Sequence, residues 1–148
     1  MIKVGVIGAS GYTGQELIKI LISHHDAKLN YLFSRGESPK KVSTIFPKFS
    51  GLVDIECSNA IDIDEIKSRC EVVFLALPHT VSMQLVPRLL IAGLKVIDLS
   101  ADYRFKDQNL YESLYKAAHS DKENLINAAY GLPELNKKNI QNTKLVAN

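Results

Sequence analysis

Residues 3–17 form the stretch KVGVIGASGYTGQEL, which decides the fold of this chain. The apolar, β-branched run 4–7 predicts a short strand that is buried on both faces. Three glycines at three-residue spacing, Gly8, Gly11 and Gly14, follow it directly. A helix is predicted next, over residues 13–24, because apolar side chains recur along it at helical spacing. This order of buried strand, glycine turn and helix favours an α/β fold.

The three glycines predict a turn that binds phosphate groups. A side chain at Gly8 would obstruct the tight turn, and one at Gly11 would keep the backbone away from a pyrophosphate. Gly14 lets the helix and the strand pack closely, and the start of the helix offers unpaired N–H groups and the positive end of its dipole. The spacing differs from the common G-x-G-x-x-G fingerprint, and alone it fits a turn without a ligand equally well. Its position directly after a buried strand favours a nucleotide.

Length and composition place the chain among ordinary globular domains and exclude several classes of function. The 148 residues are the size of one domain, 1–148, with 46% hydrophobic and 23% charged residues. A net charge of +2 is too small to indicate nucleic-acid binding, and no apolar stretch approaches the roughly 18–20 residues of a membrane span. Two cysteines, Cys57 and Cys70, form neither a disulfide framework nor a metal-ligand cluster. We expect a cytoplasmic protein without a signal peptide or a metal site.

Strand and helix signals alternate along the chain, as in a parallel sheet with crossover helices. We therefore expect a doubly wound, mostly parallel, Rossmann-like sheet with helices on both faces. The predicted strands are 4–7, 29–33, 54–57, 71–77, 94–99, 126–130 and 144–147. The predicted helices are 13–24, a short one from Ser38-Pro39 to before Pro47, 62–69, about 80–92, 109–118 and 133–140.

Several helices and single residues carry more detailed expectations. Pro87 is expected to kink or divide its helix, and Gly93 to end it. The buried face of helix 109–118 is expected to consist of Leu110, Leu114 and Ala117. Surface roles are expected for the histidines at predicted helix ends, His24, His25 and His119.

The cysteines are not expected to act as nucleophiles. A reactive thiol needs exposure and a cationic neighbour or a helix N-terminus. Cys57 lies in a minor strand, and Glu71 beside Cys70 would raise the pKa of that thiol.

Ser34-Arg35 lies where a dinucleotide fold selects its cofactor. Folds that prefer NAD place an acidic residue at the end of the second strand, where it binds the ribose 2′-OH. A hydroxyl beside a guanidinium suits a 2′-phosphate instead. The pair therefore predicts NADP, although a solvated arginine in a turn is the alternative.

Two segments beyond later strands carry further candidate residues. Pro78 and His79 follow the strand 71–77, where the chain typically runs beneath the ribose and nicotinamide; alternatively, His79 caps the next helix. Arg104 lies beyond the strand 94–99 and is a candidate for binding a substrate anion. The alternative is that Arg104 and Asp102 only pair with each other.

Four motifs in order resemble N-acetyl-gamma-glutamyl-phosphate reductase, a semialdehyde dehydrogenase of arginine biosynthesis. They are GASGYTGQEL at 8–17, FLALPH at 74–79, IDLSADYR at 97–104 and YGLPEL at 130–135. The closing residues 146–148 also resemble those leading into that family's Pro-Gly-Cys segment, so the resemblance covers the whole chain.

The resemblance implies an NADPH-dependent, homo-oligomeric enzyme that reduces an N-acetylglutamyl acyl phosphate to the semialdehyde. In that family a cysteine forms a thioester, hydride reduces it, and a histidine of a second domain assists with protons. The cysteine would follow Asn148, so we expect a cofactor-binding fragment without catalytic residues of its own, inactive in isolation. The resemblance places the cofactor at Gly8, Ser10, Gly11, Tyr12, Thr13, Gly14, Ser34, Arg35, Pro78 and His79, and the substrate at Arg104.

Other functions remain open at this point. Aspartate-semialdehyde dehydrogenase uses the same chemistry and a similar glycine turn, and a reductase of carrier-linked aminoadipate phosphate is closely related. A non-catalytic nucleotide-binding sensor is an alternative of another class. Continuation of the source gene into Pro-Gly-Cys would separate the enzymes from the sensor.

Overall fold

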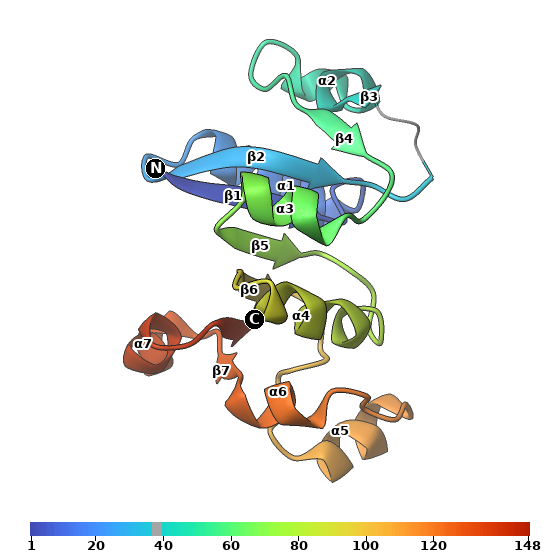
Figure 1. Ribbon diagram of the computed structural model, residues 1–148, viewed down its shortest axis with the longest axis vertical. Helices are drawn as coiled ribbons and strands as arrows, with labels where there is room; N and C mark the ends of the chain where they lie inside the picture. The colour runs from blue at the N-terminus through green and yellow to red at the C-terminus, as the bar shows by residue number, and fades with distance from the viewer. Residues whose placement is uncertain (37–39) are drawn as a thin grey trace. The chain divides into compact units, whose positions relative to one another are not determined.

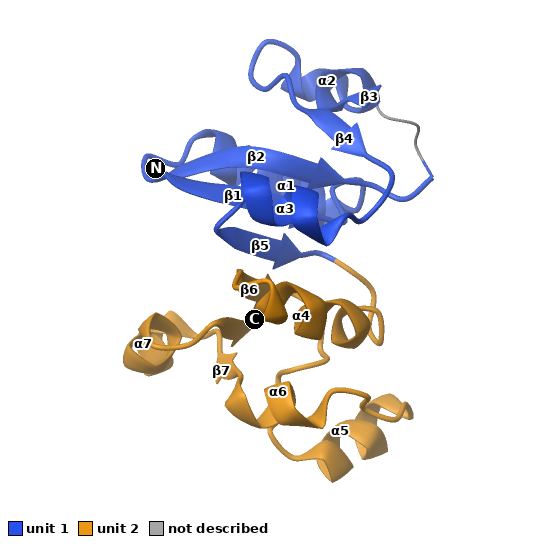
Figure 2. Cartoon of the chain, viewed as in Figure 1, with its two compact units in different colours: residues 1–76 blue, residues 77–148 orange. Residues whose placement is uncertain are grey.

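The computed structural model describes residues 1–36 and 40–148, so the helix start predicted at Ser38-Pro39 lies outside the described residues. The chain forms two compact units, Met1–Ala76 and Leu77–Asn148 (Figure 2). Each unit contains part of the predicted alternation of strands and helices, and each is described by itself.

The first unit contains a mostly parallel sheet in the order β3-β4-β2-β1-β5. β1 pairs in parallel with β2 and β5, β2 pairs in parallel with β4, and the short β3 is antiparallel to β4. The strands are β1 (Ile2–Ile7), β2 (Ala27–Phe33), β3 (Lys40–Lys41), β4 (Glu56–Ser58) and β5 (Val72–Leu75). The helical elements are α1 (Tyr12–Ile22), α2 (Val42–Ile45), the 3-10 turn η1 (Pro47–Phe49) and α3 (Ile63–Arg69).

Helices cover both faces of this sheet. In Figure 1, α3 lies in front of β1 and β2 while α1 lies behind them, and both helices contact both strands. α1 buries Ile18 and Leu21 in the core, as its periodicity predicts. α3 begins at Asp62, whose carboxylate accepts hydrogen bonds from the amides of Asp64 and Glu65. The α/β class predicted from the sequence is confirmed.

The second unit contains a parallel sheet in the order β6-β8-β7. Its strands are β6 (Lys95–Asp98), β7 (Ala129–Tyr130) and β8 (Leu145–Ala147). Its helices are α4 (Ser82–Ile91), α5 (Gln108–Tyr115), α6 (Lys122–Asn127) and α7 (Pro133–Gln141). Gly93 follows α4 with a positive φ of 91°, which confirms it as the stop of that helix.

Two predictions about helices are wrong in detail. α4 continues through Pro87 as one helix, because Leu85, Val86 and Leu89 are buried and hold it in place. The described part of the helix before Pro47 is α2, from Val42, and residues 40–41 pair with β4 as a strand.

α5 buries Tyr111, whereas Leu110 and Leu114 are exposed. The hydroxyl of Tyr111 donates to the buried carboxylate of Asp102, and this tertiary partner decides which face turns inward. The predicted strand 126–130 is shorter than expected, because its first residues belong to α6, which begins after the capping residue Asp121.

Candidate functional site

Gly8 lies where the carboxyl ends of β2, β1 and β5 meet. The amides of Gly8 and Ala9 both donate to the carbonyl oxygen of Phe33, at 3.0 and 2.9 Å, and Ala76 donates to the carbonyl of Ile7 at 2.8 Å. Gly8 has a φ of +98°, and a Cβ on it would lie 2.2 Å from the carbonyl oxygen of Ala76. The packing of the chain itself therefore requires glycine here.

Gly11 and Gly14 differ in what surrounds them. A Cβ on Gly14 would lie 2.2 Å from the carbonyl oxygen of Gly8, so this glycine allows α1 to pack on the turn. A Cβ on Gly11 would meet nothing closer than 3.6 Å, and its φ of −70° suits any residue. The described part of the chain leaves room for a side chain at Gly11.

The N-terminus of α1 is open. Its N-cap is Gly11, no side chain of the described residues caps it, and its first turn contains no acidic residue. The residues around it are exposed, namely Ser10, Gly11, Tyr12 and Thr13. The first N–H groups of a helix have no partner within the helix, and they favour an anion.

Ser34 and Arg35 lie beside this turn. They follow Phe33, the residue whose carbonyl binds the amides of Gly8 and Ala9. Ser34 is only 1% exposed, and its hydroxyl has no hydrogen-bond partner among residues 1–36 and 40–148, whereas Arg35 is exposed. A buried hydroxyl without a hydrogen bond is unfavourable, so the hydroxyl of Ser34 is a candidate for binding a ligand or water. The structure thus brings the glycine turn and Ser34-Arg35 together at one end of the first sheet.

Pro78, His79 and Arg104 belong to the second unit. Pro78 and His79 are exposed, and the Nδ1 of His79 accepts a hydrogen bond from the amide of Ala101 at 3.1 Å. His79 does not cap α4, because the carboxylate of Asp102 accepts from the amide of Met83 in its first turn and from the amide of Thr80 just before it. Its ring lies against Tyr115, with 5.3 Å between ring centroids.

Arg104 binds backbone carbonyls rather than Asp102. Its Nε donates to the carbonyl of Asn148 at 3.1 Å, and one terminal nitrogen donates to the carbonyl of Leu99 at 3.4 Å. Both the carboxylate oxygens of Asp102 bind other groups, so the proposed pairing of these two residues is wrong. Arg104 is exposed and lies near the carboxyl ends of β6 and β8.

Buried hydrogen bonds fix the loop 99–104. Asp98 accepts from the hydroxyl of Ser100 at 2.7 Å and from its amide at 3.1 Å, and the same hydroxyl accepts from the amide of Asp102. Burial raises the pKa of Asp98, while these hydrogen bonds from Ser100 oppose the rise. Burial raises the pKa of Tyr103 most, and the hydrogen bond that its hydroxyl donates to Asp121 raises it further.

Sequence reasoning missed His119. It is 2% exposed, not on the surface, and its Nε2 lies 2.7 Å from the carbonyl oxygen of Asp102. Its Nδ1 accepts from the amide of Asp121, and its ring packs edge-on against Tyr103 and Tyr111. Asp102 and Tyr103 lie well before His119 in the sequence, so its local spacing gave no signal that it is buried.

The two cysteines are buried, which agrees with the prediction that they are not nucleophiles. Burial raises the pKa of Cys70 to about 11, and Arg69 and Lys3 lower it only in part. The cause is therefore desolvation rather than the neighbouring Glu71.

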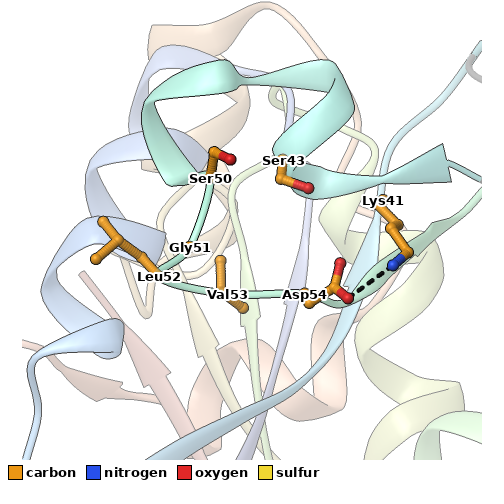
Figure 3. A pocket seen from close by; sticks show the side chains of 7 residues that line it. All are labelled: Lys41, Ser43, Ser50, Gly51, Leu52, Val53 and Asp54. Atoms are coloured by element: carbon orange, nitrogen blue, oxygen red, sulfur yellow. Dashed lines mark hydrogen bonds and ion pairs between the residues drawn. The ribbon is translucent and has the colours of Figure 1, made fainter.

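A hollow of about 450 Å³ lies elsewhere in the first unit (Figure 3). In it, Lys41 and Asp54 form an ion pair of 2.7 Å, which satisfies both charges. This pair raises the pKa of Lys41. The hollow is lined by Lys41, Ser43, Ser50, Gly51, Leu52, Val53 and Asp54, none of which the sequence motifs include.

No helix in 1–36 or 40–148 has the length and apolar character needed to cross a bilayer. Within the same ranges, no three histidine, cysteine or acidic side chains gather as ligands for a metal ion.

Comparison with known proteins identifies relatives over the whole chain. The family described as semialdehyde dehydrogenase, NAD binding domain, matches residues 3–143. N-acetyl-gamma-glutamyl-phosphate reductases of Campylobacter curvus and Sulfurimonas denitrificans are 49% and 50% identical over 147 and 148 residues. A Saccharolobus solfataricus phosphate reductase, named for LysW-linked aminoadipate and glutamate, is 43% identical over 146 residues. The alignments cover 99% of this chain but only 42%, 43% and 41% of these relatives, so the chain spans less than half their length.

Solved structures show the same fold at low sequence identity. Aspartate semialdehyde dehydrogenase II of Vibrio cholerae matches with a TM-score of 0.68 and 18% identity, covering 100% of this chain and 38% of that one. The Candida albicans enzyme, solved with NADP, matches with a TM-score of 0.66 and 21% identity, covering 95% and 36%. The resemblance predicted from the four motifs is confirmed.

Proposed function

Because this chain belongs to the semialdehyde dehydrogenase family through its NAD-binding domain, we propose that it is the NADP-binding part, residues 1–148, of an N-acetyl-gamma-glutamyl-phosphate reductase. The observation that carries the proposal is the open N-terminus of α1 near the buried hydroxyl of Ser34, which no described residue binds. The identity of 49–50% to reductases of this name supports the substrate class.

The glycine turn is suited to the diphosphate of the cofactor. Gly8 and Gly14 shape the turn, and the absent side chain of Gly11 leaves space beside the exposed amides. Backbone N–H groups and the dipole of α1 would bind the phosphate oxygens. The proposed diphosphate site comprises Gly8, Ser10, Gly11, Tyr12, Thr13 and Gly14.

Ser34 and Arg35 are suited to the 2′-phosphate that distinguishes NADP from NAD. Arg35 is exposed and carries a guanidinium that can bind two phosphate oxygens at once. The buried hydroxyl of Ser34 supplies a donor that no described residue uses.

Pro78 and His79 are proposed to line the nicotinamide end of the cofactor, and Arg104 to bind an anionic group of the acyl phosphate. Bound NADPH supplies a hydride, and the residues of this chain bind and orient the reactants. The carbonyls of Asn148 and Leu99 hold the guanidinium of Arg104 in one orientation, which favours recognition of a carboxylate or phosphate. We place the enzyme in the cytoplasm, as a homo-oligomer of arginine biosynthesis.

One of the relatives favours a different substrate for this family member. The Saccharolobus solfataricus relative, named for carrier-linked aminoadipate and glutamate phosphates, is 43% identical over nearly the whole chain. Measuring reduction of N-acetylglutamyl phosphate and of the carrier-linked substrate by the longer protein would separate the two.

Titration of the chain with NADPH and NADH tests the proposed cofactor. Arg35→Ala should weaken NADPH binding by about tenfold or more and leave NADH binding unchanged, because only NADPH carries the 2′-phosphate. Arg88→Ala removes the same charge from α4 and is the matched control. Tighter binding of NADH by the unmodified chain, or equal losses for both nucleotides in Arg35→Ala, would contradict the proposal.

A further inference from the structure

The N-terminus of α4 is capped by a residue from a different loop. Its N-cap, Val81, makes no side-chain cap hydrogen bond. The carboxylate of Asp102 takes this role, because Oδ2 accepts from the amide of Met83 at 3.3 Å and Oδ1 from the amide of Thr80 at 2.9 Å. Asp102 is fully buried, and its bond from Met83 is shielded from water.

Thr80 has a strained backbone. Its φ is +70°, in the left-handed region, which a β-branched residue adopts only where its surroundings impose it. The described residue that holds its amide is Asp102. Glycine would adopt the same conformation without strain.

The same two segments are joined one residue earlier. Ala101, which precedes Asp102, donates its amide hydrogen to the Nδ1 of His79, which precedes Thr80. Since Nδ1 accepts, the neutral imidazole carries its proton on Nε2. The loop 99–104 thus holds both the backbone of the turn and the ring of His79.

We propose that Asp102 is a positioning residue: it holds Thr80 in the left-handed conformation and thereby fixes His79 with Nε2 as its N–H donor. That the donor serves a nicotinamide nucleotide rests on the proposed function. The hydroxyl of Tyr111, on α5, also donates to Oδ1 of Asp102, at 2.8 Å, but it contacts neither Thr80 nor His79 through this bond.

The test combines Asp102→Asn with Thr80→Gly. Asparagine has nearly the shape of aspartate but only one acceptor oxygen, so we expect the turn to relax and His79 to lose its bond from Ala101. Glycine at position 80 needs no external support, so the double variant should recover the geometry. The readout is the ¹⁵N chemical shifts of the His79 ring, which distinguish the two tautomers, measured near pH 8 without nucleotide.

The expected results follow from this rescue. Asp102→Asn should mix the tautomers of His79 and raise the Kd for NADPH by about tenfold, and adding Thr80→Gly should bring the Kd to within about threefold of the starting value. Tyr111→Phe, the control, removes another bond to the same carboxylate and should leave the tautomer unchanged.

Two outcomes would overturn the proposal. One is an unchanged His79 tautomer in Asp102→Asn; the other is a double variant no better than the single one. Should Asp102→Asn alone fail to fold, Thr80→Gly must restore folding, and its failure to do so counts against the proposal. Absence of NADPH binding by the unmodified chain would instead contradict the proposed function, since the tautomer is read without nucleotide.

Discussion

The N-termini of α1 and α4 each follow a loop after a parallel strand, yet they are built in opposite ways. α1 begins at an uncapped Gly11 with exposed neighbours. α4 begins just after a strained Thr80, and the buried carboxylate of Asp102 binds the amide of Thr80 and that of Met83 in the first turn. The free amides of an uncapped helix N-terminus can bind an anion, whereas those of a capped N-terminus already have an acceptor.

The glycines of the first turn also differ, in whether the fold itself requires them. Gly8 and Gly14 face backbone atoms that a side chain would strike, so the fold requires them. Gly11 has free space around it among the described residues, so the fold does not require its lack of a side chain. Three substitutions sharpen this comparison, in order of decreasing effect.

The largest effect is expected for Gly8→Ala. The new Cβ would lie 2.2 Å from the carbonyl oxygen of Ala76, in a backbone with positive φ, so we expect a loss of about 3 kcal/mol or more in the free energy of unfolding. Gly93→Ala is the matched control, because φ is +91° there but nothing lies within 4 Å, and about 1 kcal/mol is expected. Urea unfolding followed by circular dichroism measures both, and equal losses would show that the close approach at Gly8 is unimportant.

Gly11→Ser converts the open terminus into a closed one. A serine hydroxyl at this N-cap would accept from an amide of the first turn of α1, so the chain should gain about 0.3 kcal/mol in stability. NADPH binding should weaken by about tenfold, because that amide and the space near it are taken. Thermal unfolding and a fluorescence titration give the two values, and undiminished affinity in a stabilised variant would show that the diphosphate lies elsewhere.

The smallest effect is expected in how the stability of the chain depends on pH, because the two regions differ in their carboxyl groups. Residues 8–14 contain no carboxyl group, whereas burial raises the pKa of Asp98, which anchors the loop that closes α4. The folded chain holds this proton more tightly than the unfolded chain, so the contribution favours folding at low pH and is lost as pH rises from the ordinary value of about 3.9 through the raised one.

The stability of the unmodified chain relative to Asp98→Asn should therefore fall between acid and neutral pH. Unfolding of both proteins at a series of pH values measures the difference. Gly11→Ser should follow the unmodified chain, and a difference that stays flat or rises with pH would show that Asp98 is not held as described.

The sequence predicted those parts of the fold whose causes are local. Asp62 caps α3 from the adjacent position, Gly93 ends α4 through its own backbone conformation, and Ile18 and Leu21 repeat at helical spacing. Such signals lie within a few residues of the structure that they produce. The glycine turn and Ser34-Arg35 were also predicted, because strand ends of a parallel sheet meet at one edge.

What the sequence did not predict depends on distant partners. Asp102 closes a helix that begins about 20 residues earlier, and it also decides that Tyr111 rather than Leu114 is buried in α5. His119 is buried because it reaches the backbone of Asp102. No spacing rule links these residues, so only the folded chain shows that one carboxylate connects them.

The central claim is that the open N-terminus of α1 receives the diphosphate of NADPH. The most direct measurement is a titration of the ¹⁵N-labelled chain with NADPH, followed through its amide resonances. We predict that the amides of residues 10–14 shift first and most among those at the two helix termini, while that of Met83, already bonded to Asp102, stays in place. Saturable NADPH binding with unmoved amides at residues 10–14 would contradict the account.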